Sequence, residues 1–210
     1  MVVEHRVFDI ARVMMTRAAA DGGPGTFIGH AAVFNQRTAI GDPRTFGFWE
    51  EIDPAAFDGA LGRPDDVRFL RDHNPSDLLA RTAAGTLRLS ADKRGLVAEA
   101  DLPDTPLGNT VRVHLDRGDL NQMSFAFVPT KVEWSELDDG TELARVLDVE
   151  PLVDVSVVTF PAYPETDASA RAAITAMRAS NPLRMQRRAA ALERLRRLSP
   201  PPGVTRKAVS

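Results

Sequence analysis

The sequence offers few groups that could carry chemistry, and the familiar short catalytic motifs are absent. It contains no Cys, so thiolate nucleophiles, thiolate metal sites and disulfides are excluded. No GxSxG elbow, HExxH pair or phosphate-binding glycine loop occurs. Serine chemistry needs a hydroxyl whose proton can be removed by an imidazole, with a third group that fixes the imidazole tautomer and stabilises its charge. Four histidines are available to supply that imidazole.

His73 is the histidine best placed for catalysis. It ends an apolar segment at RDHNPSD, where a loop begins, and loops on a rigid scaffold often carry site residues. His5 lies in a terminal segment that we expect to fray, His114 lies on a predicted helix and His30 lies within an apolar strand. These three are better explained by structural roles. Its position alone does not establish a catalytic role for His73.

Ser124 is the hydroxyl that best fits a nucleophile. Strand alternation sends Met123, Phe125 and Phe127 to one face and Ser124 and Ala126 to the other. We expect the bulky face to pack into the core. The Ser124 face should be half-exposed, with the small Ala126 leaving room for a substrate backbone. The same pattern fits a serine that is merely tolerated on a half-exposed strand, so alternation alone does not decide between the two.

The acid that would orient His73 is expected on the strand that follows Ser124. The turn sequence LDDG predicts a hairpin, and antiparallel pairing about that turn places Ser124 nearly opposite Asp154. Directly opposite residues share a face and have Cβ atoms about 5 Å apart. Glu150 and Asp148 lie further along the same face. They remain alternatives to Asp154, as does a Ser–His dyad without an acid.

Strands predominate among the elements that would position these residues. Apolar, β-branched and alternating segments predict strands at 26–34, 67–73, 120–134 and 143–160. At 86–102, two apolar segments that flank the polar turn ADKRG predict a β-hairpin. Two helices are predicted from their capping residues, one from Asp53-Pro54 to Gly62 and one from Thr105 to Gly118. We therefore predict a mainly β, α+β fold: a compact antiparallel β-barrel-like domain over residues 1–168, with a few flanking helices.

Length and charge indicate one domain followed by a basic tail. Of the 210 residues, 43% are hydrophobic, enough for one core, and we expect a soluble protein because no apolar run approaches the about 18 residues that span a bilayer. Residues 171–210 hold ten Arg and Lys against one acidic residue, about +9, whereas the remainder, with 16 basic and 28 acidic residues, carries −12. Residues 169–210 are thus predicted to form a basic, flexible or partly helical tail. It either seeks an acidic partner or is simply solvated.

Six segments, in order along the chain, resemble the prohead or capsid maturation serine proteases of tailed phages, which are distantly related to herpesvirus assembly proteases. They span about residues 27–166 and read GHAAVFNQ, FWEEIDPAAFDGAL, VRFLRDHNPSDLLART, LRLSADKRGLVAEADLPDT, GDLNQMSFAFVP and DVSVVTFPAYPET. Each segment alone is a weak indicator. Their common order makes the resemblance specific.

The resemblance implies a serine endopeptidase in which Ser124 is the nucleophile and His73 the general base. In the herpesvirus relatives the third member is a second histidine, and no histidine follows His114 here, so an acid must serve or the dyad stands alone. Asp154 is the preferred third member. No metal or cofactor is implied. Backbone amides would hold the oxyanion, aided by an arginine such as Arg81.

The resemblance also implies partners and a location. The substrates would be the scaffold segment of the major capsid protein precursor, any separate scaffold and the protease itself, cut inside the immature capsid (prohead) in the host cytoplasm. A homo-oligomer is compatible with this, whereas a membrane partner is not expected. Nucleic acid is not expected either, because the Arg-rich tail lacks aromatic residues for stacking. The competing hypothesis is a non-catalytic structural or scaffolding component of the virion on the same fold, since fold does not fix function.

Overall fold

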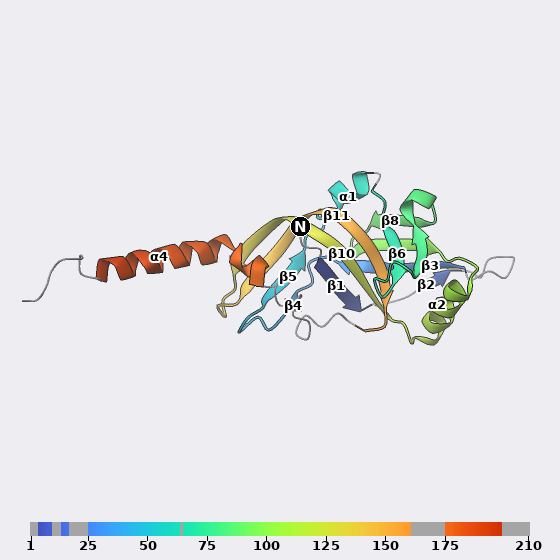
Figure 1. Ribbon diagram of the computed structural model, residues 1–210, viewed down its shortest axis with the longest axis horizontal. Coiled ribbons are helices and arrows are strands. Elements are labelled where there is room, and N and C mark those ends of the chain that lie inside the picture. The colour runs from blue at the N-terminus through green and yellow to red at the C-terminus, as the bar shows by residue number, and fades with distance from the viewer. Residues whose placement is uncertain (1–3, 10–13, 17–24, 64, 161–174, 199–210) are drawn as a thin grey trace, which may run out of the picture.

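The computed structural model describes residues 4–9, 14–16, 25–63, 65–160 and 175–198. These residues fold into two sheets with short helices at their margins, and a long C-terminal helix extends away from the sheets (Figure 1). A mainly β fold with few helices is therefore confirmed. The described strands form two separate sheets and no closed ring, so the barrel-like detail of the prediction is not confirmed.

The larger sheet contains the strands that carry the candidate residues. Its central path runs β1 (Glu4–Asp9), β10 (Gln122–Glu136), β11 (Glu142–Val158), β5 (Phe48–Ile52) and β4 (Thr38–Ile40). Two further strands, β6 (Arg68–Arg71) and β7 (Leu78–Arg81), extend it from β11. The β11–β5 and β11–β6 pairs are parallel, so the sheet is mixed rather than purely antiparallel as predicted.

The smaller sheet is antiparallel and lies over the apolar face of β10. It contains β2 (Met14–Thr16), β3 (Thr26–Val33), β9 (Gly95–Asp101) and β8 (Leu87–Ala91), in that order. Aromatic side chains fill the space between the sheets: Phe27 stacks on Phe69 at 5.0 Å, and Phe125 stacks on Phe127 at 4.7 Å. Both phenylalanines of β10 are fully buried, so the prediction that this face of the strand forms the core is confirmed.

The helices differ in how well the capping residues predicted them. In α2 (Pro106–Arg117) the Thr105 hydroxyl accepts from the Gly108 N–H at 3.2 Å, and Gly118 ends the helix with a φ of 78°, as expected for such caps. In α1 (Asp58–Gly62) the N-cap is Phe57. The prediction of a helix from Asp53 is thus wrong, because Asp53 instead accepts from the Ala55 N–H at 2.9 Å in a turn that precedes the helix. A short 3-10 helix, η1 (Thr82–Ala84), follows β7.

Residues 4–9, which were expected to fray, form a paired strand. This strand, β1, pairs antiparallel with β10, and Val7 lies opposite Ser124. The Arg6 guanidinium donates two hydrogen bonds to the Glu50 carboxylate of β5, the longer at 2.8 Å, and both residues are buried. Arg6 also lies over the Phe127 ring, 5.4 Å from its centroid. The first strand is therefore fastened to the strand that carries Ser124.

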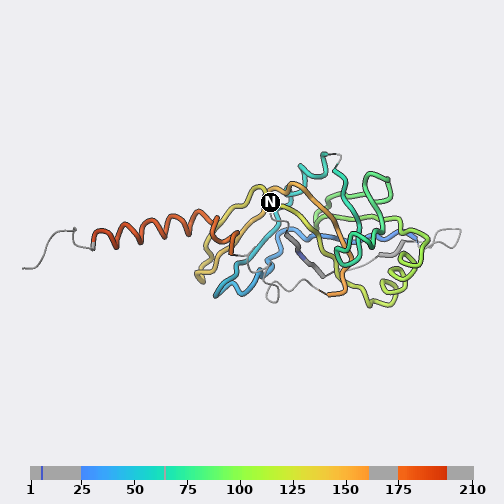
Figure 2. Tube along the Cα trace, in the orientation of Figure 1, coloured from blue at the N-terminus to red at the C-terminus, as the bar shows by residue number. Residues whose placement is uncertain are grey.

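In the described part of the C-terminal segment, the near end of the helical region is anchored on the body. The predicted domain boundary at 168 lies outside the described residues, and α4 (Pro182–Leu198) begins after a short helical stretch at 175–179. Met177 packs on Ile40, Phe48 and Ala144. From there the helix leaves the body and continues well past the hairpin end (Figure 2). Within the described part of the chain, no helix is long and apolar enough to cross a membrane.

Candidate active site

The β10–β11 hairpin places Ser124 in the interior of the larger sheet. Near the turn the pairing is the predicted one, with Glu136 opposite Glu142. Bulges between Ala126 and Val132 then shift the register, so that Ala126 faces Asp154 rather than Leu152. Ser124 is consequently opposite Ser156, and the prediction that it lies opposite Asp154 is wrong by two residues. A shift of two keeps every side chain on its face.

Ser124 is also more enclosed than its strand pattern predicts. The residue is 0% exposed, as is Ala126, so the prediction of a half-exposed face is wrong. The reason is that both faces of this part of the hairpin are covered, and alternation along one strand cannot show what packs over its second face. A hydroxyl in such a place is shielded from bulk water, which strengthens its interactions with neighbouring charged groups.

His73 lies in a tight turn between β6 and β7. The Asn74 N–H donates to the Arg71 carbonyl at 3.0 Å, and the two central residues, Asp72 and His73, have φ values of 53° and 55°. Positive φ at both central positions defines a type I′ turn, which Gly and Asn usually occupy. β6 is paired in parallel with the end of β11. The turn therefore carries the imidazole to the face of β11 that also bears Asp154.

The two ring nitrogens of His73 contact the other two candidate residues. Nδ1 lies 2.6 Å from Oδ1 of Asp154, and Nε2 lies 2.6 Å from Oγ of Ser124. Ser124 and Asp154 are buried, and the His73 side chain is 18% exposed. The arrangement can transfer a proton from the hydroxyl to Nε2 while the carboxylate holds the Nδ1–H tautomer. The structure thus brings together the three residues selected from the sequence.

A fourth polar side chain, Ser156, completes the cluster and was not found from the sequence. Its hydroxyl donates to Oδ1 of Asp154 at 2.8 Å and lies 3.3 Å from Nδ1 of His73. The residue is 0% exposed. Its position two residues after Asp154 puts both side chains on the same face, and this spacing was the available indicator.

The other candidate acids lie elsewhere. Glu150 is largely exposed and pairs with Arg63, whose Nη1 is 3.5 Å from its Oε2. Asp148 accepts a hydrogen bond from the Thr130 hydroxyl. Neither carboxylate contacts His73 among the interactions of the described residues, whereas Asp154 does.

The remaining histidines have partners outside the cluster. His30 lies 2.9 Å from Asp92 and His114 lies 3.1 Å from Asp119, each ring nitrogen to a carboxylate oxygen. His5 lies in β1 opposite Ala126. Their predicted exclusion from catalysis is consistent with these positions for His30 and His114.

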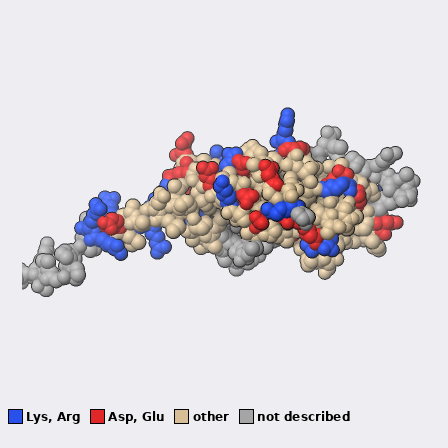
Figure 3. Space-filling model, turned by 90° about the horizontal axis from the view of Figure 1, so that it is seen from above, with Lys and Arg blue, Asp and Glu red and all other residues tan. Residues whose placement is uncertain are grey.

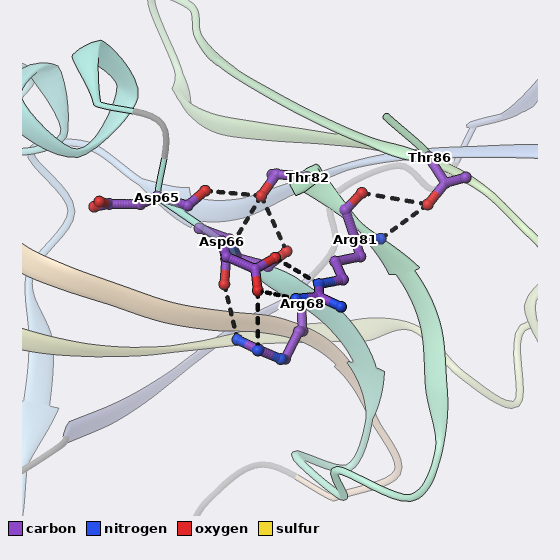
Figure 4. A network of polar contacts seen from close by, with 7 residues as sticks. Asp65, Asp66, Arg68, Arg81, Thr82 and Thr86 are labelled. Carbon is purple, nitrogen blue, oxygen red and sulfur yellow. Dashed lines mark hydrogen bonds and ion pairs between the residues drawn. The ribbon is translucent and has the colours of Figure 1, made fainter. Parts of the chain in front are cut away.

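Arg81, considered from the sequence as an aid to the oxyanion, is committed to a polar network around Asp66 (Figure 4). Its Nε donates to Oδ1 of Asp66 at 2.7 Å, and Arg68 donates to Oδ2 at 3.0 Å. The hydrogen bond from Arg81 is the main reason that the pKa of Asp66 lies below its ordinary value, while burial opposes the change. Thr82 joins the network by accepting from the Val67 N–H at 2.9 Å. This network braces β6 and β7, the strands that flank the His73 turn.

The described residues contain no group of three or more His, Asp or Glu side chains that could hold a metal ion. The groups that the cluster does offer are the Ser124 hydroxyl, the His73 imidazole and the Asp154 carboxylate. These are the components of a serine hydrolase triad.

Three comparisons with known proteins bear on the chain. A family model described as caudovirus prohead serine protease matches residues 12–180. Among solved structures, the bacteriophage T4 capsid assembly protease gp21 aligns with a TM-score of 0.45 and 7% identity, covering 73% of this chain and 96% of that one. No curated protein matches the sequence.

Proposed function

Because the chain belongs to the caudovirus prohead serine protease family, we propose that it is a serine endopeptidase that uses Ser124, His73 and Asp154. The observation that supports these roles is the position of one imidazole between two partners. Nε2 of His73 lies 2.6 Å from the Ser124 hydroxyl, and Nδ1 lies 2.6 Å from the Asp154 carboxylate. A general base must lie within hydrogen-bond reach of the proton it removes, and this imidazole does.

In the proposed mechanism, Oγ of Ser124 attacks the scissile carbonyl while Nε2 of His73 takes the hydroxyl proton. The C–O bond forms as the carbonyl π pair moves onto oxygen. When the tetrahedral intermediate collapses, the C–N bond breaks and His73 returns the proton to the leaving amine. A water molecule, deprotonated by the same nitrogen, then attacks the acyl carbon. The ester C–O bond breaks, and His73 returns the proton to Oγ of Ser124 as the acid product leaves. Asp154 stays ionised throughout and stabilises the imidazolium.

The proposed substrates are the major capsid protein precursor with its scaffold segment, any separate scaffold, and the protease itself. Family membership supports a role in capsid assembly, and cleavage would take place inside the immature capsid, in the host cytoplasm. No cofactor is needed for the proposed chemistry. Because Ser124 is enclosed, a substrate peptide reaches Oγ only after the site opens. This suits a protease that must not cut host proteins before it reaches its own substrate.

We further propose that the far half of α4 recruits the protease to the assembling shell. Arg184 Nε donates to Glu142 Oε1 at 2.6 Å and Arg187 pairs with Glu136, so these arginines are used to fix the helix on the hairpin end. Beyond them, arginines gather on the protruding end of the molecule (Figure 3). Leu192 and Leu195 are 51% and 60% exposed. A basic helix with exposed leucines suits an acidic amphipathic partner.

The test of the proposed function is co-expression with the phage's own capsid protein precursor. Wild-type protein should convert the precursor into shorter chains, and mass spectrometry of the new termini would locate the cut. Ser124→Ala should abolish conversion. Ser135→Ala, at an exposed serine on the same strand, should leave it intact and serves as the matched control. Undiminished conversion by Ser124→Ala would refute the proposal.

A further inference from the structure

Ser156 is a buried hydroxyl that the proposed mechanism does not use. It is 0% exposed, yet its oxygen is within hydrogen-bond reach of two members of the candidate triad. A buried serine could satisfy its hydroxyl on any nearby carbonyl, as most buried hydroxyls do. The partner here is instead the carboxylate oxygen that also faces the imidazole.

The backbone holds Ser156 rigidly. β11 is a central strand at this point, with Ser156 paired to Ser124 of β10 on one side and to Leu70 of β6 on the other. A residue paired on both sides has little backbone freedom, and a fully buried side chain is restricted to few rotamers. The Ser156 hydroxyl therefore has a fixed position between β10, which carries Ser124, and β6, which leads to His73.

Oδ1 of Asp154, the hydroxyl of Ser156 and Nδ1 of His73 lie within hydrogen-bond distance of one another. Ser156 donates to Oδ1 at 2.8 Å, and His73 Nδ1 approaches the same oxygen at 2.6 Å. The Ser156 oxygen and Nδ1 are themselves 3.3 Å apart. Two donors converging on one oxygen prevent the carboxyl group from rotating away. Because a carboxylate oxygen only accepts hydrogen bonds, the short contact with Oδ1 requires the proton of the neutral imidazole to be on Nδ1. Nε2 is then unprotonated and can act as the base.

We infer that Ser156 is a positioning residue for the proposed reaction: its hydroxyl fixes the Asp154 carboxylate so that His73 stays aligned on Ser124. The inference rests on the proposed function. Ser156 acts through Asp154 and touches no substrate atom, so its loss should reduce turnover without weakening substrate binding. Because the whole effect passes through the carboxylate, it should vanish when Asp154 can no longer act as an anionic acceptor.

The first arm of the test is steady-state kinetics on a peptide that spans the cleavage site. Ser156→Ala should lower kcat by about 10- to 100-fold and leave KM within about twofold. Combined with Asp154→Asn, the same change should have an effect of less than about twofold. Thr141→Val is the matched control, because Thr141 is a buried hydroxyl that donates to another carboxylate, Asp139, at 2.6 Å, at the far turn of the hairpin. It should leave kcat unchanged.

The second arm needs no turnover. Proton NMR of the His73 Nδ1–H signal should show a changed shift and faster exchange in Ser156→Ala, and no change in Thr141→Val. If Ser156→Ala does not fold, Ser156→Cys replaces it, since a thiol is nearly the same shape and a weak donor.

The possible outcomes distinguish failure of the role inferred for Ser156 from failure of the proposed function. An active wild type with unchanged kcat and an unchanged Nδ1–H signal in the Ser156 variant would overturn the inference alone. An equal loss from Ser156→Ala in the wild-type and the Asp154→Asn backgrounds would overturn it too, because the effect would then be general destabilisation. A wild-type protein that neither cleaves nor reacts at Ser124 would refute the proposed function, and the inference with it.

Discussion

The carboxylate of Asp72 accepts two hydrogen bonds from Thr159, one from its backbone N–H at 2.6 Å and one from its hydroxyl at 3.0 Å. The Asp72 N–H also donates to the Val157 carbonyl at 2.9 Å. The turn that carries His73 is thereby fastened to the end of the strand that carries Asp154. A backbone with positive φ at two successive non-glycine residues is costly, and these bonds hold it in place.

Loss of this fastening should reduce activity. Asp72→Ala removes both acceptors and places a residue with no polar side chain in the left-handed region, which costs about 1–2 kcal/mol. Since a displacement of about 1 Å can lower turnover about a hundredfold, we expect kcat to fall by about 10- to 100-fold. Asp72→Asn, which keeps one oxygen acceptor and tolerates this backbone, should fall less. Equal kcat for Asp72→Ala and wild type on a peptide substrate would contradict the prediction.

The third member of the triad can be identified by substituting each candidate acid. Asp154→Asn should lower kcat by about 10⁴-fold, because a neutral amide stabilises neither the Nδ1–H tautomer nor the imidazolium. Glu150→Gln and Asp148→Asn are the matched controls, and each should retain nearly full activity, since their carboxylates pair with Arg63 and Thr130. Circular dichroism checks that each variant is folded. A larger loss from Glu150→Gln than from Asp154→Asn would show that the acid is misassigned.

Residue patterns together with the family resemblance predict the three residues that the structure brings together, but not their geometry. Asp154 was selected from a register that is wrong by two residues, and it remained on the Ser124 face because an even shift preserves faces. The bulges between Ala126 and Val132 that cause the shift leave no clear mark in the sequence. Ser156 was missed because its role depends on the contacts made after that shift.

The fold was predictable where local chemistry determines it. The β8–β9 hairpin, α2 and the β10–β11 hairpin follow from turn and capping residues. The pairing of β1 with β10 is not predictable from local sequence, because it depends on contacts distant in sequence, such as that between Arg6 and Phe127. The parallel pairing of β5 and β6 with β11 is equally non-local. Periodicity in one segment carries no information about which other segment covers it.

Acid should weaken the fold in part through Asp53. Its pKa lies below the ordinary 3.8, chiefly because of the hydrogen bond from the Ala55 N–H and secondarily the Arg145 guanidinium, with burial opposing. A lowered folded-state pKa contributes stability that is complete above the unfolded value and is lost as the pH falls through the folded value. Thermal unfolding should therefore show wild type more stable than Asp53→Asn at about pH 7, with the difference shrinking below 3.8. A difference that stays constant in acid would contradict this.

The recruitment role of α4 can be tested without disturbing the body. A chain ending after Arg187 keeps the ion pairs to Glu136 and Glu142 and removes only the protruding half. It should cleave a peptide at the wild-type rate yet enter co-expressed shells in smaller amounts. Exposed ion pairs contribute only about 0.2–1 kcal/mol each and are screened by salt. Recruitment of the wild-type protein should therefore also weaken as the salt concentration rises. Normal incorporation of the shortened chain would mean that the helix is simply solvated.

The most direct test of the whole account is the reaction of the purified protein with a serine-directed phosphonate, followed by mass spectrometry of its peptides. Only a serine activated by a neighbouring base reacts readily with such a reagent. We expect one adduct, on Ser124, absent from Ser124→Ala and strongly reduced in His73→Ala. No adduct on the folded wild type, or an adduct on Ser156 instead, would contradict the assignment of Ser124 as the nucleophile.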